Sequence, residues 1–331
     1  MRADRGERKP AKADLDFAAG LAALLDGELV GASMLGDEAL LVRLAGGRQL
    51  VAKRVARQSQ GTWRPGKPWA ELVALDALSA RGAPVPRIVA ADLGHGWLAL
   101  EYVPGVGLQE VCEAGAPPAT TRLAAFVSLV NALEQLEHAF AAEWEHLSPW
   151  AAPVADDHRQ LAAGLAPLLD HGAHDAWNEL AALAIQRGAV HPGPLDVQPG
   201  NVIWGERPSR VTFVDMASFG HDVTEKRLVA YAQKAGPGPR SLLDHLAYGE
   251  YERLKGREAA LRLAFFDLLY WGMALARLLA AQRAPGSVAA ERVREVWGDP
   301  EALIAPFAAM WRRERLDDPR IERVQHGLAA V

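Results

Sequence analysis

The chain has little cysteine and no excess of basic residues. Its 331 residues include one cysteine, Cys112, which excludes an internal disulfide and any zinc site built from several cysteines. We expect Cys112 to be a small buried hydrophobic residue. The 36 Lys and Arg residues against 41 Asp and Glu residues leave a net charge of −5, which argues against non-specific binding to nucleic acid.

Long apolar runs are also scarce. Residues 1–13 are charged and lack the apolar segment of a secretory signal, so we expect a flexible tail there. Residues 261–281 are long and apolar enough to test as a membrane span, but Arg262, Asp267 and Arg277 interrupt them. A buried helix is therefore expected there. We predict a soluble, cytoplasmic protein that does not act at a membrane.

What is present is ordinary for a large globular protein. Half of the residues are hydrophobic and 23% are charged, and the length allows two lobes with substantial cores. No internal repeat is visible. The oligomeric state cannot be derived from these features.

Two polar segments carry side chains typical of phosphoryl transfer. The segment LDVQPGNVIW holds Asp196 and Asn201 on either side of a Pro-Gly turn, and a run of β-formers at 211–214 leads to Asp215. One carboxylate near a substrate hydroxyl, with an amide oxygen and a second carboxylate for Mg²⁺, is the set that phosphoryl transfer requires. Taken singly, each residue is equally explained by turn formation or strand capping.

The N-terminal part supplies matching nucleotide-site residues. Lys53 lies in the alternating strand RQLVAKRV, and Glu71 follows in a segment whose apolar residues recur at helical spacing. A strand Lys paired with a helix Glu is how a kinase holds the α- and β-phosphates. Further on, the strand WLALEYVPGVGL breaks at a Pro-Gly pair. We predict a hinge there, with backbone groups of Glu101 and Val103 bonded to an adenine.

A glycine-containing segment precedes the Lys53 strand. In VGASMLGDEALLVRL we predict phosphate contacts from Gly31, Ser33 and Gly36, because glycine lets backbone amides approach a phosphate closely. The alternative is a simple turn, since the segment does not have the G-x-G-x-x-G pattern. A second turn is expected at AGGR, before the Lys53 strand.

On these residues the chain resembles the aminoglycoside phosphotransferase and choline kinase-like branch of the protein-kinase-like superfamily, from about residue 25 to residue 222. The resemblance implies an α+β, two-lobed protein-kinase-like fold. The small N-lobe has an antiparallel sheet with one helix, and the larger C-lobe is mainly helical.

The resemblance also implies roles for individual residues. It identifies Asp196 as the catalytic Asp, Asn201 and Asp215 as the metal ligands, and Lys53 with Glu71 as the phosphate-anchoring pair. Mg²⁺ is the implied cofactor and ATP the implied co-substrate, although a preference for GTP is equally open.

The domain organisation follows from these positions. We expect a tail at 1–13, a nucleotide-binding N-lobe at 14–103, and a C-lobe at 104–331 with the catalytic loop and the substrate-binding helices. The expected helices cover 15–25, the segment around Glu71, 119–140 with a Thr cap, 161–169, 176–185, 241–256 and 260–282, and further strands are expected at 87–91 and 97–101.

The catalytic loop departs from the family pattern. Where the family usually has a His two residues before the catalytic Asp, this chain has Pro194, and the nearest histidine is His191. Some other group must therefore brace the loop. His191 is either a displaced brace or a histidine with a hydrogen bond and no catalytic part, and we favour the second.

A group of charges follows the second metal-ligand segment. Glu225, Lys226 and Arg227, with Lys234 and Arg240, are interpreted as exposed helix charges, and the alternative is a surface that meets an anionic group.

Three functions fit the sequence. The first is a kinase acting on a hydroxyl of a small molecule, such as an antibiotic, an amino alcohol, a sugar or a related metabolite. The alternative is a catalytically degenerate, nucleotide-binding pseudokinase that acts as a regulatory module. The third is a kinase of proteins or another macromolecule. The presence of Asp196, Asn201 and Asp215 favours the first over the second, and the lack of an APE-like motif and activation segment favours it over the third.

Overall fold

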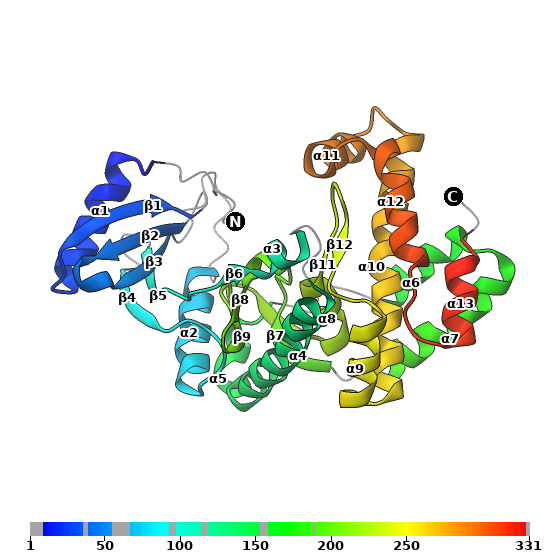
Figure 1. The fold of residues 1–331 in the computed structure, drawn as a ribbon, viewed down its shortest axis with the longest axis horizontal. Coiled ribbons are helices and arrows are strands. Elements are labelled where there is room, and N and C mark those ends of the chain that lie inside the picture. Colours follow the sequence, from blue (N-terminus) through cyan, green and yellow to red (C-terminus); the bar gives the residue numbers. More distant parts are fainter. Residues whose placement is uncertain are drawn as a thin grey trace.

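A computed structural model of the chain describes residues 9–35, 39–54, 67–92, 97–113, 118–152, 158–187 and 190–328. Within these ranges the chain forms an α+β fold with a small sheet-based N-lobe, on the left of Figure 1, and a larger helical C-lobe on the right. The predicted fold class is confirmed.

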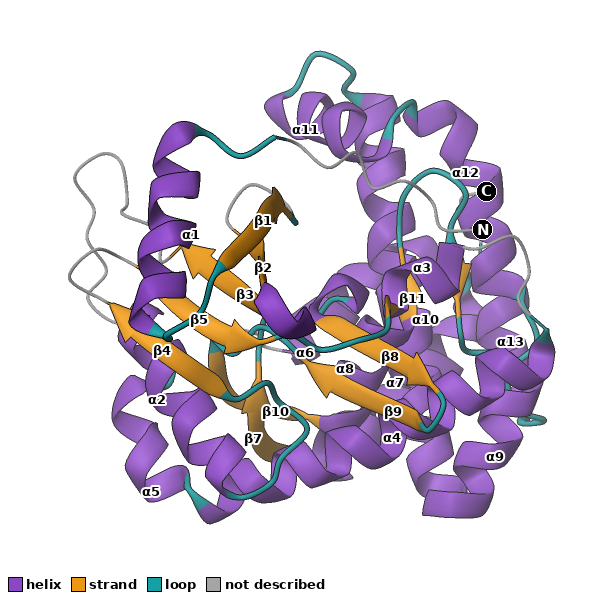
Figure 2. Ribbon diagram, turned by 60° about the vertical axis from the view of Figure 1, so that its left-hand side comes forward, coloured by secondary structure: helices purple, strands orange, loops and turns teal. Residues whose placement is uncertain are grey.

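The N-lobe is built on a five-stranded antiparallel sheet with the strand order β1-β2-β3-β5-β4 (Figure 2). Its β2–β3 turn is the one predicted at AGGR. Gly46 and Gly47 there have φ of +76° and +79°, in the left-handed region that favours glycine. The strands are β1 Leu29–Met34, β2 Ala39–Leu44, β3 Gln49–Arg54, β4 Ile88–Asp92 and β5 Trp97–Glu101.

Both faces of this sheet are covered by helices. Helix α1 (Lys12–Leu24) packs Leu21 in the core that contains Leu50, and α2 (Lys67–Ala80) packs Leu75 in the core that contains Leu98. The N-lobe therefore contains both helices expected from the sequence, at 15–25 and around Glu71, where the resemblance implied one. Each covers one face of the central strands, on which alternate residues are apolar. Helix α1 begins at Lys12, so the last two residues of the predicted tail are helical.

The chain leaves the N-lobe at Pro104 and Gly105 and pairs at once with the C-lobe. Gly105 has φ of +151°, and a Cβ there would lie 2.6 Å from the carbonyl oxygen of Trp204. Glycine at this connection lets two backbones meet closely. The C-lobe strands form the sheet β6-β8-β9 and the pairs β7–β10 and β11–β12. Their bounds are β6 Val106–Gly107, β7 Val190–Pro194, β8 Val202–Glu206, β9 Ser209–Phe213, β10 Phe219–Val223, β11 Gln233–Lys234 and β12 Arg240–Ser241.

Helix α10 (Arg257–Arg283) is the central element of the C-lobe, and α8, α9, α11 and α12 pack around it (Figure 1). Among the described helices it is the one that is long and apolar enough to cross a membrane, but 72% of its apolar window is buried inside the molecule. The prediction of a buried core helix is therefore confirmed. The other helices are α3 Leu108–Glu113, α4 Ala119–Ala142, α5 Trp144–Leu147, α6 His158–Leu165, α7 His171–Arg187, α8 Thr224–Ala232, α9 His245–Lys255, α11 Val288–Trp297, α12 Pro300–Arg312 and α13 Pro319–His326.

Among the predicted helices, the Thr cap of the helix at 119–140 and the end of the helix at 161–169 are wrong. Helix α4 starts after Pro118, and no threonine side chain caps it. The helix predicted at 161–169 ends at Leu165 and continues as a 3₁₀ turn around Pro167, because proline removes a backbone donor and clashes with the preceding turn.

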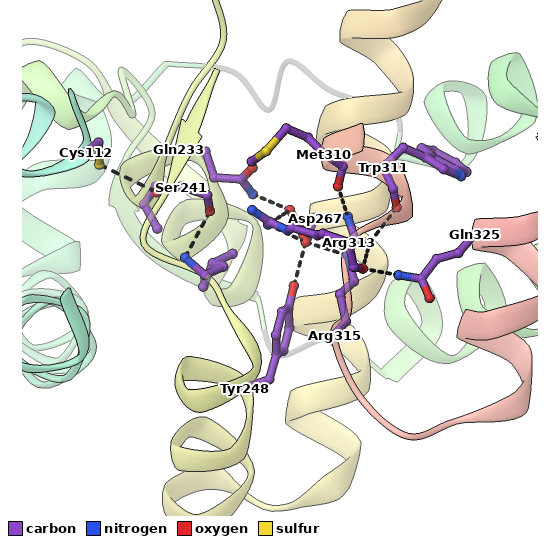
Figure 3. A network of polar contacts seen from close by, with 12 residues as sticks. Cys112, Gln233, Ser241, Tyr248, Asp267, Met310, Trp311, Arg313, Arg315 and Gln325 are labelled. Atoms are coloured by element: carbon purple, nitrogen blue, oxygen red, sulfur yellow. Dashed lines mark hydrogen bonds and ion pairs between the residues drawn. The ribbon is translucent and has the colours of Figure 1, made fainter. Parts of the chain in front are cut away.

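A buried polar network joins α10 to the C-terminal segment (Figure 3). Asp267 of α10 is fully buried and accepts hydrogen bonds from Arg313 Nη2 at 2.7 Å and Arg315 Nε at 2.6 Å. The hydroxyl of Tyr248 donates to it at 2.6 Å, and Gln233 Nε2 donates at 2.5 Å. One carboxylate thus ties together α9, α10, β11 and the chain after α12.

Candidate active site

Lys53 of β3 meets Glu71 of α2 as predicted. In the β3–β5 pairing Lys53 lies opposite Leu98, whose side chain packs in the core that contains α2. Residues opposite each other in an antiparallel pair share a face, so the Lys53 side chain points toward α2. Its Nζ donates to Glu71 Oε1 at 2.8 Å and to Oε2 at 3.0 Å.

Asp215 is a second partner of the same lysine. Its Oδ1 lies 3.2 Å from Lys53 Nζ and accepts a hydrogen bond from the amide of Ala217 at 3.1 Å. The exposed fractions of the Lys53 and Asp215 side chains are 20% and 27%, so both border solvent. The ammonium therefore lies between two carboxylates that come from opposite lobes.

The protonation of Lys53 and Glu71 depends on their burial and on the neighbouring charges. Burial by itself lowers the pKa of the Lys53 ammonium, but the carboxylates of Glu71 and Asp215 outweigh it, and the pKa is raised. Burial raises the pKa of Glu71, and Lys53 offsets this only in part. Lys53 therefore keeps its positive charge at neutral pH, as a ligand for phosphate oxygens requires.

The catalytic-loop residues are brought to the same place. Asp196 follows β7 and is exposed, and Asn201 lies in the 3₁₀ turn Pro199–Asn201. Asn201 Nδ2 donates to the carbonyl of Asp196 at 3.1 Å, and its own carbonyl accepts from the amide of Val214 at 3.0 Å. Since Val214 directly precedes Asp215, these two bonds set Asp196, Asn201 and Asp215 side by side.

Asn201 and Asp215 fit a magnesium ion by their chemistry. Asn201 Oδ1 accepts a hydrogen bond from Gln198 Nε2 at 3.4 Å and keeps a second lone pair for a cation. Asp215 Oδ1 is already bonded to Ala217 and Lys53, which leaves Oδ2 as the oxygen for the ion. Mg²⁺ usually takes one or two protein oxygens and completes its shell with water and substrate phosphates. No group of three or more His, Cys, Asp and Glu suited to a metal occurs among the described residues.

Glu101 and Val103, the two residues predicted to contact an adenine, differ in their backbone hydrogen bonds. The amide of Glu101 donates to the carbonyl of Arg87 at 2.9 Å, and the Glu101 carboxylate pairs with the Arg87 side chain at 2.7 Å. Its N–H is thus used within the sheet. Val103 follows β5, is half-buried, and has no backbone hydrogen bond to any other described residue.

The predicted phosphate loop is only partly described. Gly31 lies inside β1 and pairs with Arg43. Ser33 is 4% exposed, and its Oγ has no hydrogen-bond partner in the described part of the chain. Gly36 lies outside the described residues, so the phosphate contacts of these three residues stay a prediction.

The charged residues at 225–227, 234 and 240 do not all lie on an exposed helix, contrary to the expectation from the sequence. Glu225 and Arg227 are 3% and 0% exposed, because α8 packs between α4 and α10. Lys226 is half-buried, and Lys234 and Arg240 lie on the β11–β12 hairpin and not on a helix. The interpretation as solvated helix charges is therefore wrong for Glu225 and Arg227.

One sequence signal for this burial was missed. Glu137 is four residues after Leu133 and three before Phe140, two members of the apolar face of α4. A glutamate on such a face needs a buried cation as partner. Glu137 Oε1 accepts from Arg227 Nη1 at 2.5 Å, and both side chains are buried.

Comparisons with known proteins agree with this geometry. The profile of the phosphotransferase enzyme family matches residues 36–222, more than half of the chain, and includes the Lys53, Glu71, Asp196, Asn201 and Asp215 positions. A search of curated proteins found no match.

Solved structures of similar fold cover nearly the whole chain. The GDP complex of a mutant aminoglycoside 2′-phosphotransferase-IIIa is 14% identical with a TM-score of 0.55, over 90% of this chain and 98% of that one. The GDP and kanamycin complex of APH(2″)-IIIa is 14% identical with a TM-score of 0.51, over 89% and 99%. A macrolide 2′-phosphotransferase from Brachybacterium faecium is 18% identical with a TM-score of 0.48, over 84% and 97%. The first two establish that the fold is shared.

Proposed function

Since the chain belongs to the phosphotransferase enzyme family, we propose that it transfers the γ-phosphoryl group of ATP to a hydroxyl of a small molecule. The observation that carries this proposal is the position of Lys53, bonded to Glu71 and Asp215 together. The same carboxylate lies beside Asn201 and Asp196 through the bonds of the catalytic loop.

The nucleotide would lie between the lobes. The backbone of Val103 would bond to the adenine, and Lys53 would donate to the α- and β-phosphates. Glu71 orients the lysine through its two hydrogen bonds of 2.8 and 3.0 Å. This arrangement holds the nucleotide before the reaction, and such positioning is most of what an enzyme contributes to phosphoryl transfer.

Asp196 would act on the acceptor. Its side chain is exposed at the end of the loop and can accept a hydrogen bond from a substrate hydroxyl. It would orient the hydroxyl oxygen toward the γ-phosphorus and take the proton as transfer proceeds. Asn201 and Asp215 would hold Mg²⁺, which neutralises charge on the phosphate oxygens when it is bound.

For the phosphate acceptor we propose a chemical class and not a single compound. The first two similar structures are aminoglycoside phosphotransferases, and no activation segment is evident after Asp215. Both facts support a small-molecule acceptor such as an antibiotic, an amino alcohol, a sugar or a related metabolite. We further propose a cytoplasmic location and no nucleic-acid or membrane partner.

Calorimetry with Mg²⁺ tests the nucleotide site directly. We expect the wild type to bind ATP only when Mg²⁺ is present, and Asp215→Ala to lose this binding because it removes a metal ligand and a Lys53 partner. Titration with GTP decides the nucleotide preference, since two similar structures hold GDP. Asp76→Ala, an exposed carboxylate on α2, serves as the control and should bind like the wild type.

The outcomes separate the two functions. Metal-dependent binding, followed by transfer of labelled phosphate to a hydroxyl in an acceptor panel, supports the kinase. Nucleotide binding without any hydrolysis or transfer would support the pseudokinase, and undiminished binding by Asp215→Ala would overturn the site.

A further inference from the structure

Arg227 of α8 is the most completely buried charge near the catalytic loop. Its exposed fraction is 0%, and its guanidinium makes four hydrogen bonds. Nε donates to the carbonyl of Pro194 at 2.9 Å, and Nη2 donates to the carbonyls of His191 and Gly220 at 3.0 Å each. Nη1 donates to Glu137 Oε1 at 2.5 Å. A single side chain thus joins three backbone carbonyls and one carboxylate.

These carbonyls belong to β7, which leads into the loop of Asp196, and to β10, which follows the segment of Asp215. Pro194 ends β7 two residues before Asp196, and Gly220 lies in β10, which follows Asp215. The two strands pair in register, with Gly220 opposite Gly193. Arg227 therefore links the base of the catalytic loop to the base of the segment that carries Asp215.

Gly193 makes room for this guanidinium. A Cβ on Gly193 would lie 2.9 Å from Cζ and 3.0 Å from Nη1 of Arg227. Any larger side chain would therefore push the guanidinium away from the carbonyls that it holds. The glycine and the arginine form one packed unit under the loop.

The charge of Arg227 is balanced inside the protein. Glu137 of α4 is 5% exposed and accepts from Arg227 Nη1 and from the hydroxyl of Thr224 at 2.6 Å. A buried guanidinium without such a carboxylate would be costly. With Glu137 as its counter-ion, the guanidinium can be held under the loop without contact with solvent.

We propose that Arg227, held by Glu137 and packed on Gly193, is the positioning residue that braces the catalytic loop and sets Asp196 relative to Asp215. It takes the structural place that the missing loop histidine leaves open. His191 contributes its backbone carbonyl to the brace. The kinetic part of this inference rests on the proposed phosphoryl transfer, and the structural part does not.

Lysine cannot replace arginine in this role. Arginine has five donors in a fixed fork, and Arg227 uses them on four acceptors that surround it. Lysine keeps the charge but has one nitrogen, which cannot reach both strands in the same geometry. Arg227→Lys is therefore the variant that loosens the brace without leaving Glu137 unpaired.

Arg315 offers a matched control far along the chain. Its side chain is also 0% exposed, and it also binds one buried carboxylate, that of Asp267. It donates to three backbone carbonyls as well, those of Met310, Trp311 and Arg313, at 2.7 to 3.1 Å. Arg315→Lys thus removes the same kind of brace in the C-terminal segment and leaves the catalytic loop untouched.

The experiment compares both variants with the wild type by Mg·ATP hydrolysis, in which water takes the place of the unidentified acceptor. We expect Arg227→Lys to lower kcat by about 10- to 100-fold, the scale of a displacement of about 1 Å in a positioned group. The Kd for Mg·ATP should stay within about threefold of the wild type, since Lys53 and Glu71 are unchanged. Arg315→Lys should lower Tm but keep kcat within about twofold.

Hydrogen–deuterium exchange gives a readout without turnover. We expect faster exchange of residues 190–201 in Arg227→Lys and unchanged exchange there in Arg315→Lys. Equal losses of kcat in the two variants, or unchanged exchange of residues 190–201 in Arg227→Lys, would show that Arg227 does not position the loop.

A second pair of variants tests the same inference if Arg227→Lys folds poorly. Gly193→Ala displaces the guanidinium and should give the same loss of kcat and the same local exchange, whereas Gly249→Ala, with no atom within 4 Å of the added Cβ, should give neither. A wild type that neither binds nor hydrolyses ATP would refute the proposed function alone, and the exchange measurement would still decide whether Arg227 holds the loop.

Discussion

At the level of single residues, the active site depends on how few contacts Asp196 has. It is exposed, and Asn201 binds its backbone carbonyl and not its carboxylate. Lys53, in contrast, is held by two carboxylates within 3.2 Å. The side of the site proposed to bind the nucleotide is therefore preformed, and the side proposed to meet the acceptor keeps an exposed carboxylate.

The different surroundings of Asp196 and Lys53 predict that a change at Asp196 lowers kcat without weakening the binding of Mg·ATP. We expect Asp196→Asn to bind Mg·ATP like the wild type and to lower kcat by about 10²- to 10⁴-fold, the usual contribution of a general base. Calorimetry and steady-state phosphoryl transfer measure the two effects, with Asp76→Asn as the control. A large loss of ATP affinity in Asp196→Asn would contradict the role of Asp196 on the acceptor side.

At the level of elements, the C-lobe depends on the close approach of other helices to α10. Gly272 is the contact point, because a Cβ there would lie 2.6 Å from Leu165 Cδ1 of α6 and 2.6 Å from Trp311 Cζ3 of α12. Trp311 is fully buried and cannot move aside freely. Glycine is thus kept inside a long helix despite its low helix propensity.

The close packing around Gly272 predicts that replacing glycine with alanine changes the free energy of unfolding in opposite directions at Gly272 and Gly249. Gly272→Ala should lower the free energy of unfolding by about 1–3 kcal/mol, because overpacking outweighs the gain in helix propensity. Gly249→Ala, on the exposed side of α9 with no atom within 4 Å, should raise it by up to about 1 kcal/mol. Urea unfolding measures both, and equal effects would show that α10 has room at Gly272.

At the level of the whole molecule, the Asp267 network couples the C-terminal segment to the core (Figure 3). Burial raises the pKa of Asp267, but Arg313 and Arg315 outweigh it, and the pKa is lowered from 3.8 to about 2. The folded-state pKa is thus below the unfolded value. The stabilisation is present above about pH 4 and is lost as the pH falls toward 2.

The lowered pKa of Asp267 predicts that the difference in free energy of unfolding between the wild type and Asp267→Asn depends on pH in the acid range. The ionised Asp267 contributes about 2 kcal/mol by proton linkage, so the gap in free energy of unfolding should narrow as the pH falls below about 4. Urea unfolding from about pH 6 to pH 3 measures the gap. A constant gap for Asp267→Asn would contradict the lowered pKa of Asp267.

Local patterns by themselves determined most of the elements, whereas the fold class was implied by the family resemblance and the pairing of Lys53 with Glu71 by the way kinases hold phosphates. Alternation along the Lys53 strand and helical spacing around Glu71 act over a few residues, so both can be derived from the order of the chain. The buried α10 follows in the same way, since charges within an apolar run favour a core helix over a membrane span.

Only the tertiary structure decided which partners the buried charges have. Arg227 and Glu137 are ninety residues apart, and Asp267 is 46 and 48 residues from its two arginines. Such pairs depend on how α4, α8 and α10 pack, and no local pattern specifies that packing. For the same reason, Asp215 emerged as a partner of Lys53, and Arg227 as the brace of the catalytic loop, only once the two lobes were in place.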